Sequence, residues 1–122
     1  MKAAKFATFA LVLLIGAIIF NSIYISKTTK NFAIAIEEID TSDFKNAHDK
    51  LNFIYEKFKK AEKIISITVS HDDLTNIEEC FADIIGAAKA GAKDDLTKAK
   101  SRLTDALLHL GRLSSINLDS II

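Results

Sequence analysis

An uncharged apolar run close to the start of the chain constrains the fold more than any other feature of the sequence. The run occupies residues 6–25 and contains no Asp, Glu, Lys or Arg. As a helix it is about 30 Å long, which matches the hydrocarbon core of a bilayer. Lys5 precedes the run and Lys27 follows it. We therefore predict a basic N-terminus and transmembrane anchor over residues 1–27, and an extramembrane domain over residues 28–122.

A cleaved export signal is the alternative interpretation of this run, because Lys2 and Lys5 ahead of an apolar stretch also fit such a signal. Cleavage requires small residues at its site, and no A-x-A pattern occurs between Phe20 and Ala33. The sequence therefore favours an uncleaved signal anchor in the cell membrane.

The charges that flank the anchor favour one orientation by a single unit. Lys2, Lys5 and the amino terminus lie on one side, whereas Lys27 and Lys30 lie on the other. The more basic flank of a membrane-spanning helix generally stays in the cytoplasm. We therefore expect a cytoplasmic N-terminus and an extracytoplasmic domain.

Apolar residues recur at steps of three and four through the rest of the chain, which is the spacing of one helix face. Four such seams occupy residues 32–39, 44–65, 74–88 and 96–113. The breaks between them contain residues that begin or end helices, namely those of Asp40–Asp43, Ser70, Asp73, Gly91, Asp94 and Asp95. The absence of proline and the presence of only four glycines argue against a strand-rich domain. We predict an all-α fold, in which the transmembrane helix continues into an antiparallel up-and-down helical bundle.

Local details follow from the same spacing. The first helix is predicted to run unbroken from about Ala4 to Ile39. The β-branched residues 64–69 are interpreted as the end of the second helix, in which Ile64 widens the seam. Gly111 is a candidate stop for the fourth helix, which would let the apolar tail fold back on the bundle. A parallel coiled-coil oligomer is the rival architecture, but capping turns interrupt each seam too early for it.

Composition and motifs argue against several classes of function. From residue 28 onward, 13 basic residues face 16 acidic ones, which excludes a strongly basic surface for nucleic acid. Cys80 is the single cysteine, so a disulfide within the chain is impossible. None of His48, His71 and His109 completes an E-x-x-H pair of a di-iron bundle. Asp105 is one turn before His109, which we interpret as a surface ion pair. We predict no enzymatic activity and no cofactor.

Four lysines in the second predicted helix form a candidate lipid contact. The first helix rises only about 20 Å between Ser26 and Asp40, so the longer second helix returns to head-group height and must bend aside or tilt. The lysines of its later part are Lys57, Lys59, Lys60 and Lys63. Near an anionic surface each contributes about 1 kcal/mol of attraction. The alternative is a solvated face whose lysines pair with acidic residues between positions 72 and 83.

A second polar group stands at the start of the third predicted helix. His71, Asp72 and Asp73 directly follow Ser70. A serine with an acidic residue three positions later is the pattern of a capping box, and an imidazole often hydrogen-bonds such a turn. We interpret these residues as a structural corner.

The order of these features resembles that of a family of small bacterial proteins. The resemblance rests on the basic start and apolar anchor, on HDDLTNI at residues 71–77, on LLHL at residues 107–110 and on SINLDSII at residues 115–122. The family is a domain of unknown function found in Gram-positive spore-forming anaerobes. The resemblance implies membrane attachment, no assigned activity and, from neighbouring genes, a multi-pass membrane protein as partner.

Together these features favour a protein that acts by binding. We expect an accessory subunit or scaffold for an integral membrane partner, in contact with membrane lipid. A lipid-surface or envelope-stress sensor is one alternative, and a metal-dependent enzyme is another. The sequence leaves the oligomeric state open.

Overall fold

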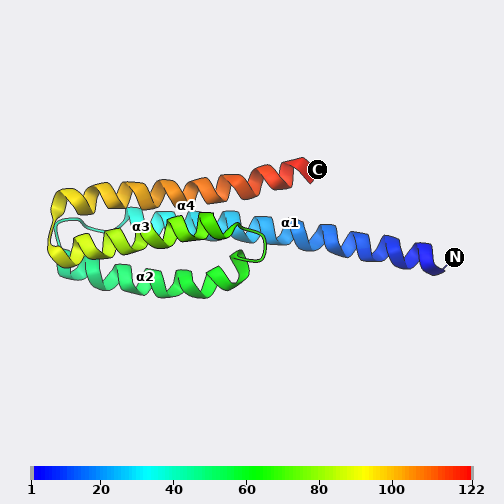
Figure 1. Ribbon diagram of the computed structural model, residues 1–122, viewed down its shortest axis with the longest axis horizontal. Helices are drawn as coiled ribbons and strands as arrows, with labels where there is room; N and C mark the ends of the chain where they lie inside the picture. Colours follow the sequence, from blue (N-terminus) through cyan, green and yellow to red (C-terminus); the bar gives the residue numbers. More distant parts are fainter. Residues whose placement is uncertain (1, 122) are drawn as a thin grey trace.

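The computed structural model describes residues 2–121, and the side chains of residues 2–114. It contains four α-helices, α1 (Lys2–Glu37), α2 (Phe44–Ile65), α3 (His71–Ala90) and α4 (Lys93–Ile121). The helices alternate in direction, each packs against its neighbours in sequence, and α4 closes the bundle against α1 (Figure 1). This arrangement confirms the predicted all-α antiparallel bundle.

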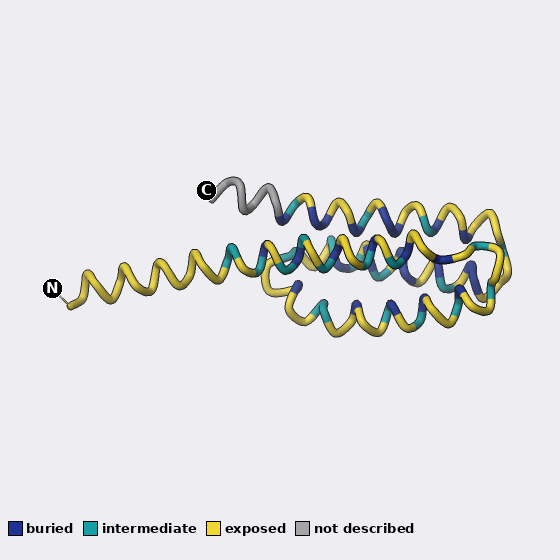
Figure 2. The backbone as a smooth tube through the Cα atoms, turned by 180° about the vertical axis from the view of Figure 1, so that it is seen from behind, coloured by how far each residue is buried: buried dark blue, intermediate teal, exposed yellow. Residues whose placement is uncertain are grey.

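Helix α1 has two parts that differ in burial. Every side chain from Lys2 to Ala17 is exposed, and this part projects beyond the bundle (Figure 2). The second part buries one face, at Ser22, Ile25, Thr29, Ala33 and Ile36. The steps of three and four between these residues keep them on one side of the helix. Packing against the bundle therefore begins inside the predicted anchor, and α1 has no break at residue 27.

The ends of the helices are fixed by local capping. The Asp43 carboxylate accepts a hydrogen bond from the Asn46 backbone N–H at 3.2 Å, at the start of α2. Gly91 ends α3 with a φ of 67°, a left-handed conformation that favours glycine. These caps lie where the sequence predicts them, because Asp43 bonds to the backbone three residues away and Gly91 adopts a backbone conformation that suits glycine.

The second helix ends earlier than the sequence indicates. α2 stops at Ile65, and residues 66–69 form turns in which Ile67 and Thr68 donate to carbonyls three residues earlier. The expected helical end at residues 64–69 is therefore wrong beyond Ile65. Ile64 is 45% exposed and does not widen the buried seam. Nor does α2 diverge from α1 at this end, because Thr68 in the turn that follows α2 is hydrogen-bonded to Asn21 of α1.

The fourth helix ends later than the sequence indicates. α4 continues through Gly111 to Ile121, so Gly111 is not a stop and the backbone of the tail extends the helix instead of folding back. Gly111 is buried against α1, where its lack of a side chain permits close approach to Thr29. The side chains of residues 115–122, including the apolar ones of the tail, lie outside the described part of the chain.

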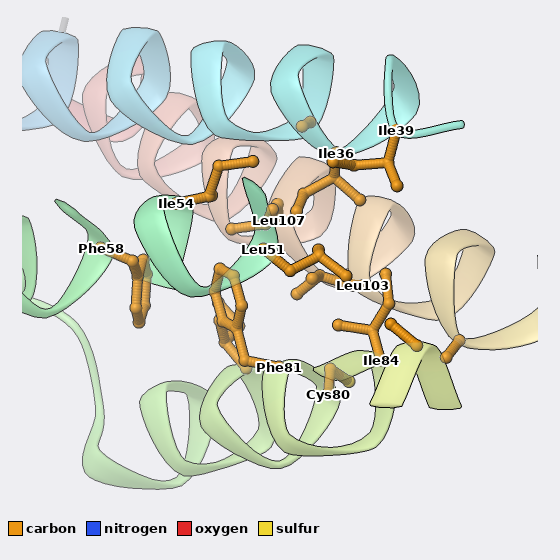
Figure 3. Close-up of a cluster of buried hydrophobic side chains, with 14 of the residues drawn as sticks. Ile36, Ile39, Leu51, Ile54, Phe58, Cys80, Phe81, Ile84, Leu103 and Leu107 are labelled. Atoms are coloured by element: carbon orange, nitrogen blue, oxygen red, sulfur yellow. The ribbon is translucent and has the colours of Figure 1, made fainter. Parts of the chain in front are cut away.

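The core contains a group of phenylalanine rings among aliphatic side chains. The Phe58 and Phe81 rings lie 5.1 Å apart, and Phe32 packs edge-on to Phe58 at 5.8 Å. Leu103 and Leu107 of α4 complete the core from the opposite side (Figure 3). Such close packing of large side chains stabilises the bundle by removing apolar area from water.

Candidate membrane-contact site

The projecting part of α1 presents apolar side chains on all sides. Phe6, Phe9, Val12 and Leu14 are each more than half exposed, and none of them contacts the bundle core. Among the described residues, α1 is the one helix that is long and apolar enough to cross a membrane. A helix that is apolar all round is suited to a lipid environment.

The turn between α2 and α3 lies beside α1 where its projecting part begins. The Asn21 side-chain amide donates a hydrogen bond to the Thr68 hydroxyl at 2.5 Å, across 47 positions of sequence. This bond identifies the end of the bundle that faces the membrane if α1 spans it. The turn carries Ile67, which is 75% exposed, next to the half-exposed Ile64.

The four predicted lysines divide into different environments. The Lys59 ammonium donates to Glu78 at 2.7 Å and lies 3.5 Å from Glu62, and its bond to Glu78 raises the Lys59 pKa. The Lys57 ammonium lies 4.5 Å from the centre of the Phe53 ring, within cation–π range.

Lys60 and Lys63 are exposed, and neither has an ion pair with any side chain that the structure describes. For Lys59 alone, the ion pair agrees with the alternative interpretation, in which the lysines form a solvated face paired with acidic residues. Contact of the lysines with lipid stays a prediction.

Two carboxyl groups meet where α2 packs on α3. Burial raises the pKa of Glu62, and the neighbouring Glu78 raises it further. The pKa of Glu78 is lowered, first by its hydrogen bond from Lys59 and then by Glu62. One oxygen of Glu62 is buried and has no hydrogen-bond partner within the described part of the chain. The two acids therefore hold a proton more readily at Glu62 than at Glu78.

The predicted corner lies at the start of α3. His71 is the first residue of this helix, and the Ser70 hydroxyl accepts from the Asp73 backbone N–H at 3.2 Å while donating to the Asp73 carboxylate at 2.8 Å. Asp72 and Asp73 lie in the first helical turn, where negative charge is favourable. Their contacts are local to the helix start.

A groove opens at the same end of the bundle, between α1, α4 and the α2–α3 turn. Its volume is about 560 Å³, and its polar lining among apolar side chains comes from Ser22, Thr68, Ser70, Asp73 and Ser114. It forms because α1 and α4 continue past the turn that joins the other two helices.

The remaining candidate residues are dispersed. Asp105 and His109 are both exposed on α4. Cys80 is 5% exposed in the core, and burial raises the pKa of its thiol. No group of three or more His, Cys, Asp or Glu side chains that could hold a metal ion occurs within the described residues.

Sequence reasoning missed the contact of Asn21 with the α2–α3 turn and the exposure of Ile67. Asn21 interrupts the apolar run, and this polar interruption is the signal that could have indicated a contact with another segment. Ile67 has no such signal, because its exposure depends on where α2 ends.

No family model, curated protein or solved structure matches this chain.

Proposed function

We propose that this protein is a signal-anchored, single-span protein of the bacterial cell membrane that works by binding, as an accessory or scaffold for an integral membrane partner. The observation that supports the proposal is the continuity of α1, which is exposed and apolar up to Ala17 and then forms one of the four bundle helices. A bundle built on its own anchor helix is attached to the anchor without a flexible linker and is held close to the lipid. Such an arrangement suits a module that meets a partner in the same membrane.

The outward face of α1 supports a membrane partner. Phe20, Ile23 and Ile34 are about half exposed or more and lie on the side of α1 away from the core. Phe20 and Ile23 continue the apolar surface of the projecting part past the start of the bundle, and the exposed Lys27 and Lys30 separate them from Ile34. A transmembrane protein beside α1 could therefore contact it within the lipid and directly above it.

The proposed orientation places the bundle outside the cytoplasm, because the N-terminal flank of the anchor carries one more positive charge than the other. The fold decides where a reporter should be placed. α4 runs back towards the membrane-facing end, whereas the turn between α1 and α2 lies at the opposite end (Figure 1).

Ser42 in the α1–α2 turn is exposed and suits a cysteine label, and the buried Cys80 gives little background. A membrane-impermeant maleimide should label Ser42→Cys in intact cells. Labelling only after the cells are broken would overturn the orientation.

The partner can be tested by photo-crosslinking in native membranes. A crosslinking residue in place of Ile23 or Ile34 should give one protein adduct of constant mass. The partner in this adduct should also co-purify with the wild type in stoichiometric amount. The matched control is Lys98, an exposed residue near the opposite end of the bundle, on α4. Equal adducts from Ile23, Ile34 and Lys98, or no protein adduct at all, would contradict an accessory function.

A lipid-surface sensor is the second candidate, because Lys60 and Lys63 are exposed and outside the ion pairs of the described side chains. For a sensor, resistance to proteolysis in vesicles should rise with the fraction of anionic lipid. The double variant Lys60→Gln, Lys63→Gln should lose this dependence, whereas Lys45→Gln, Lys50→Gln should keep it. An equal dependence in both variants would exclude the sensor.

A further inference from the structure

The apolar run is longer than the part of α1 that the bundle leaves free. Exposed side chains extend from Phe6 only to Ala17 before burial begins, which is about 18 Å of helix. The hydrocarbon core of a bilayer is about 30 Å thick. If α1 crosses the membrane, the lipid must reach the end of the bundle.

The position of the α2–α3 turn shows how far this overlap extends. Thr68 of the turn is hydrogen-bonded to Asn21, four residues before Ile25, where the uncharged run ends. Four residues of helix correspond to about 6 Å. The turn therefore lies about 6 Å inside the end of the apolar run, a depth typical of segments that sit in the lipid interface.

Polar donors in the turn are already hydrogen-bonded within the protein. The backbone N–H groups of residues 66–69 all donate to carbonyls of α2. The Ser66 hydroxyl donates to the Lys63 carbonyl, and the Thr68 hydroxyl accepts from Asn21. Polar groups that are already paired within the protein lose little when they leave water.

The outer surface of the turn has the chemistry of an interfacial segment. Ile67 is 75% exposed and Ile64 is 45% exposed, although both are large apolar side chains. Lys60 precedes Ile64 by one helical turn on the same face of α2, and Lys63 precedes Ile67 by four residues. Long lysine side chains can extend from apolar surroundings to the phosphates of the head groups.

We propose that the α2–α3 turn is a second membrane-contact site of this protein, at which Ile64 and Ile67 enter the interface of the bilayer that α1 spans. Lys60 and Lys63 then lie at the height of the lipid phosphates. This inference rests on the proposed membrane anchor. Asp72 and Asp73 begin α3 close to the turn and offset part of the lysine charge, so apolar insertion supplies the main attraction and anionic lipid is not required.

Depth-dependent fluorescence quenching tests the proposal on the full chain. An environment-sensitive fluorophore is attached to a single cysteine in a Cys80→Ala background, and the protein is inserted into phosphatidylcholine vesicles that contain quencher-labelled lipid. The three labelled variants are Ile67→Cys in the turn, Val12→Cys in the projecting part of α1, and Lys98→Cys near the opposite end of the bundle. All three native side chains are exposed, so labelling should not disturb the core.

We expect the probe at residue 67 to be quenched several-fold more than the probe at residue 98, with a blue-shifted emission, and the probe at residue 12 to be quenched most strongly. Equal, weak quenching at residues 67 and 98 with strong quenching at residue 12 would overturn the second contact and leave the anchor intact. A failure of quenching at residue 12 would overturn the anchor itself. A probe at residue 67 that is shielded from both quencher and water would indicate that a second protein chain covers the turn. That result would also contradict the proposal.

Discussion

Gly111 of α4 faces Thr29 of α1 so closely that a methyl group on Gly111 would lie 2.7 Å from the Thr29 Oγ1. Thr29 cannot easily move aside, because it is fully buried and its hydroxyl donates to the Ile25 carbonyl at 2.8 Å. The contact joins α1 and α4, the first and last helices of the chain, near the end of the bundle at which α1 enters it.

We therefore expect Gly111→Ala to destabilise the protein. The clash costs about 1–3 kcal/mol, which exceeds the gain of up to about 1 kcal/mol from replacing a helical glycine. Chemical or thermal unfolding in detergent, followed by circular dichroism, measures the change. Gly86→Ala is the matched control, because Gly86 also lies within a helix but has open space beside it. Equal stability of the two variants would show that the close approach is absent.

The same contact can be tested by coupling. Thr29→Ala removes the atom with which the new methyl group would clash. The additional loss from Gly111→Ala should therefore be smaller in the Thr29→Ala background than in the wild type, by about 0.5–3 kcal/mol for residues in contact. Additive losses would contradict the assigned geometry.

Thr104 should be replaceable with a gain in stability. Its side chain is buried in α4, and its hydroxyl has no hydrogen-bond partner among the residues that the structure describes. Valine has nearly the same shape and removes the unpaired group, which costs about 1–3 kcal/mol when buried. Thr104→Val should raise the melting temperature, whereas Thr97→Val on the exposed side of α4 should leave it nearly unchanged. A lower melting temperature for Thr104→Val would mean that the hydroxyl has a partner.

A soluble fragment should need residues from within the apolar run. Ile25 is almost fully buried in the bundle, and Ser22 is buried one turn before it. A fragment of residues 28–122 lacks both and should be less stable than one of residues 18–122 by at least about 2 kcal/mol. Urea unfolding of the two fragments makes the comparison. Ile25→Ala in the longer fragment should reproduce part of the loss, and no difference between the fragments would place residues 22–25 outside the core.

The stability of the wild type relative to Glu62→Gln should depend on pH. Burial raises its pKa in the folded state, so the folded protein holds this proton more tightly than the unfolded chain does. The resulting penalty is present above the folded-state pKa and disappears as pH falls through it to the unfolded-state value. At neutral pH, Glu62→Gln should therefore melt at a higher temperature than the wild type, and the difference should vanish in acid.

Glu56→Gln provides the control for this titration, because Glu56 is an exposed acid of the same helix. Its melting temperature should follow that of the wild type at every pH. A constant difference between Glu62→Gln and the wild type across the pH range would contradict the assigned pKa direction.

Periodicity was sufficient to predict the helices and much of their buried face. Leu51, Phe58 and Leu103 lie in the core as their spacing predicts, because a helix of 3.6 residues per turn carries such positions on one side. In α4 the seam departs from the regular steps. Leu107 is fully buried, whereas its neighbour Ala106 is only partly so, since the rotation of α4 against α1 and α3 depends on tertiary packing.

The boundary between lipid and protein could not be predicted from composition. A position that faces lipid and a position inside a bundle, such as that of Ile25, both require an apolar side chain. An apolar run therefore does not reveal where one environment replaces the other. The pairing of Lys59 with Glu78 was also only one of several combinations open to the sequence, because it depends on how α2 and α3 are rotated against each other.

If α1 spans the bilayer as proposed, its unbroken course from Lys2 to Glu37 connects the membrane-spanning segment directly to the part that packs in the bundle. A tilt of the membrane-spanning segment then tilts the whole bundle, and the resulting sideways displacement grows with distance from the bilayer. A thinner or thicker membrane changes the tilt of a membrane-spanning helix. Such a change would displace the turn at Asp40, which lies at the opposite end of the bundle, sideways.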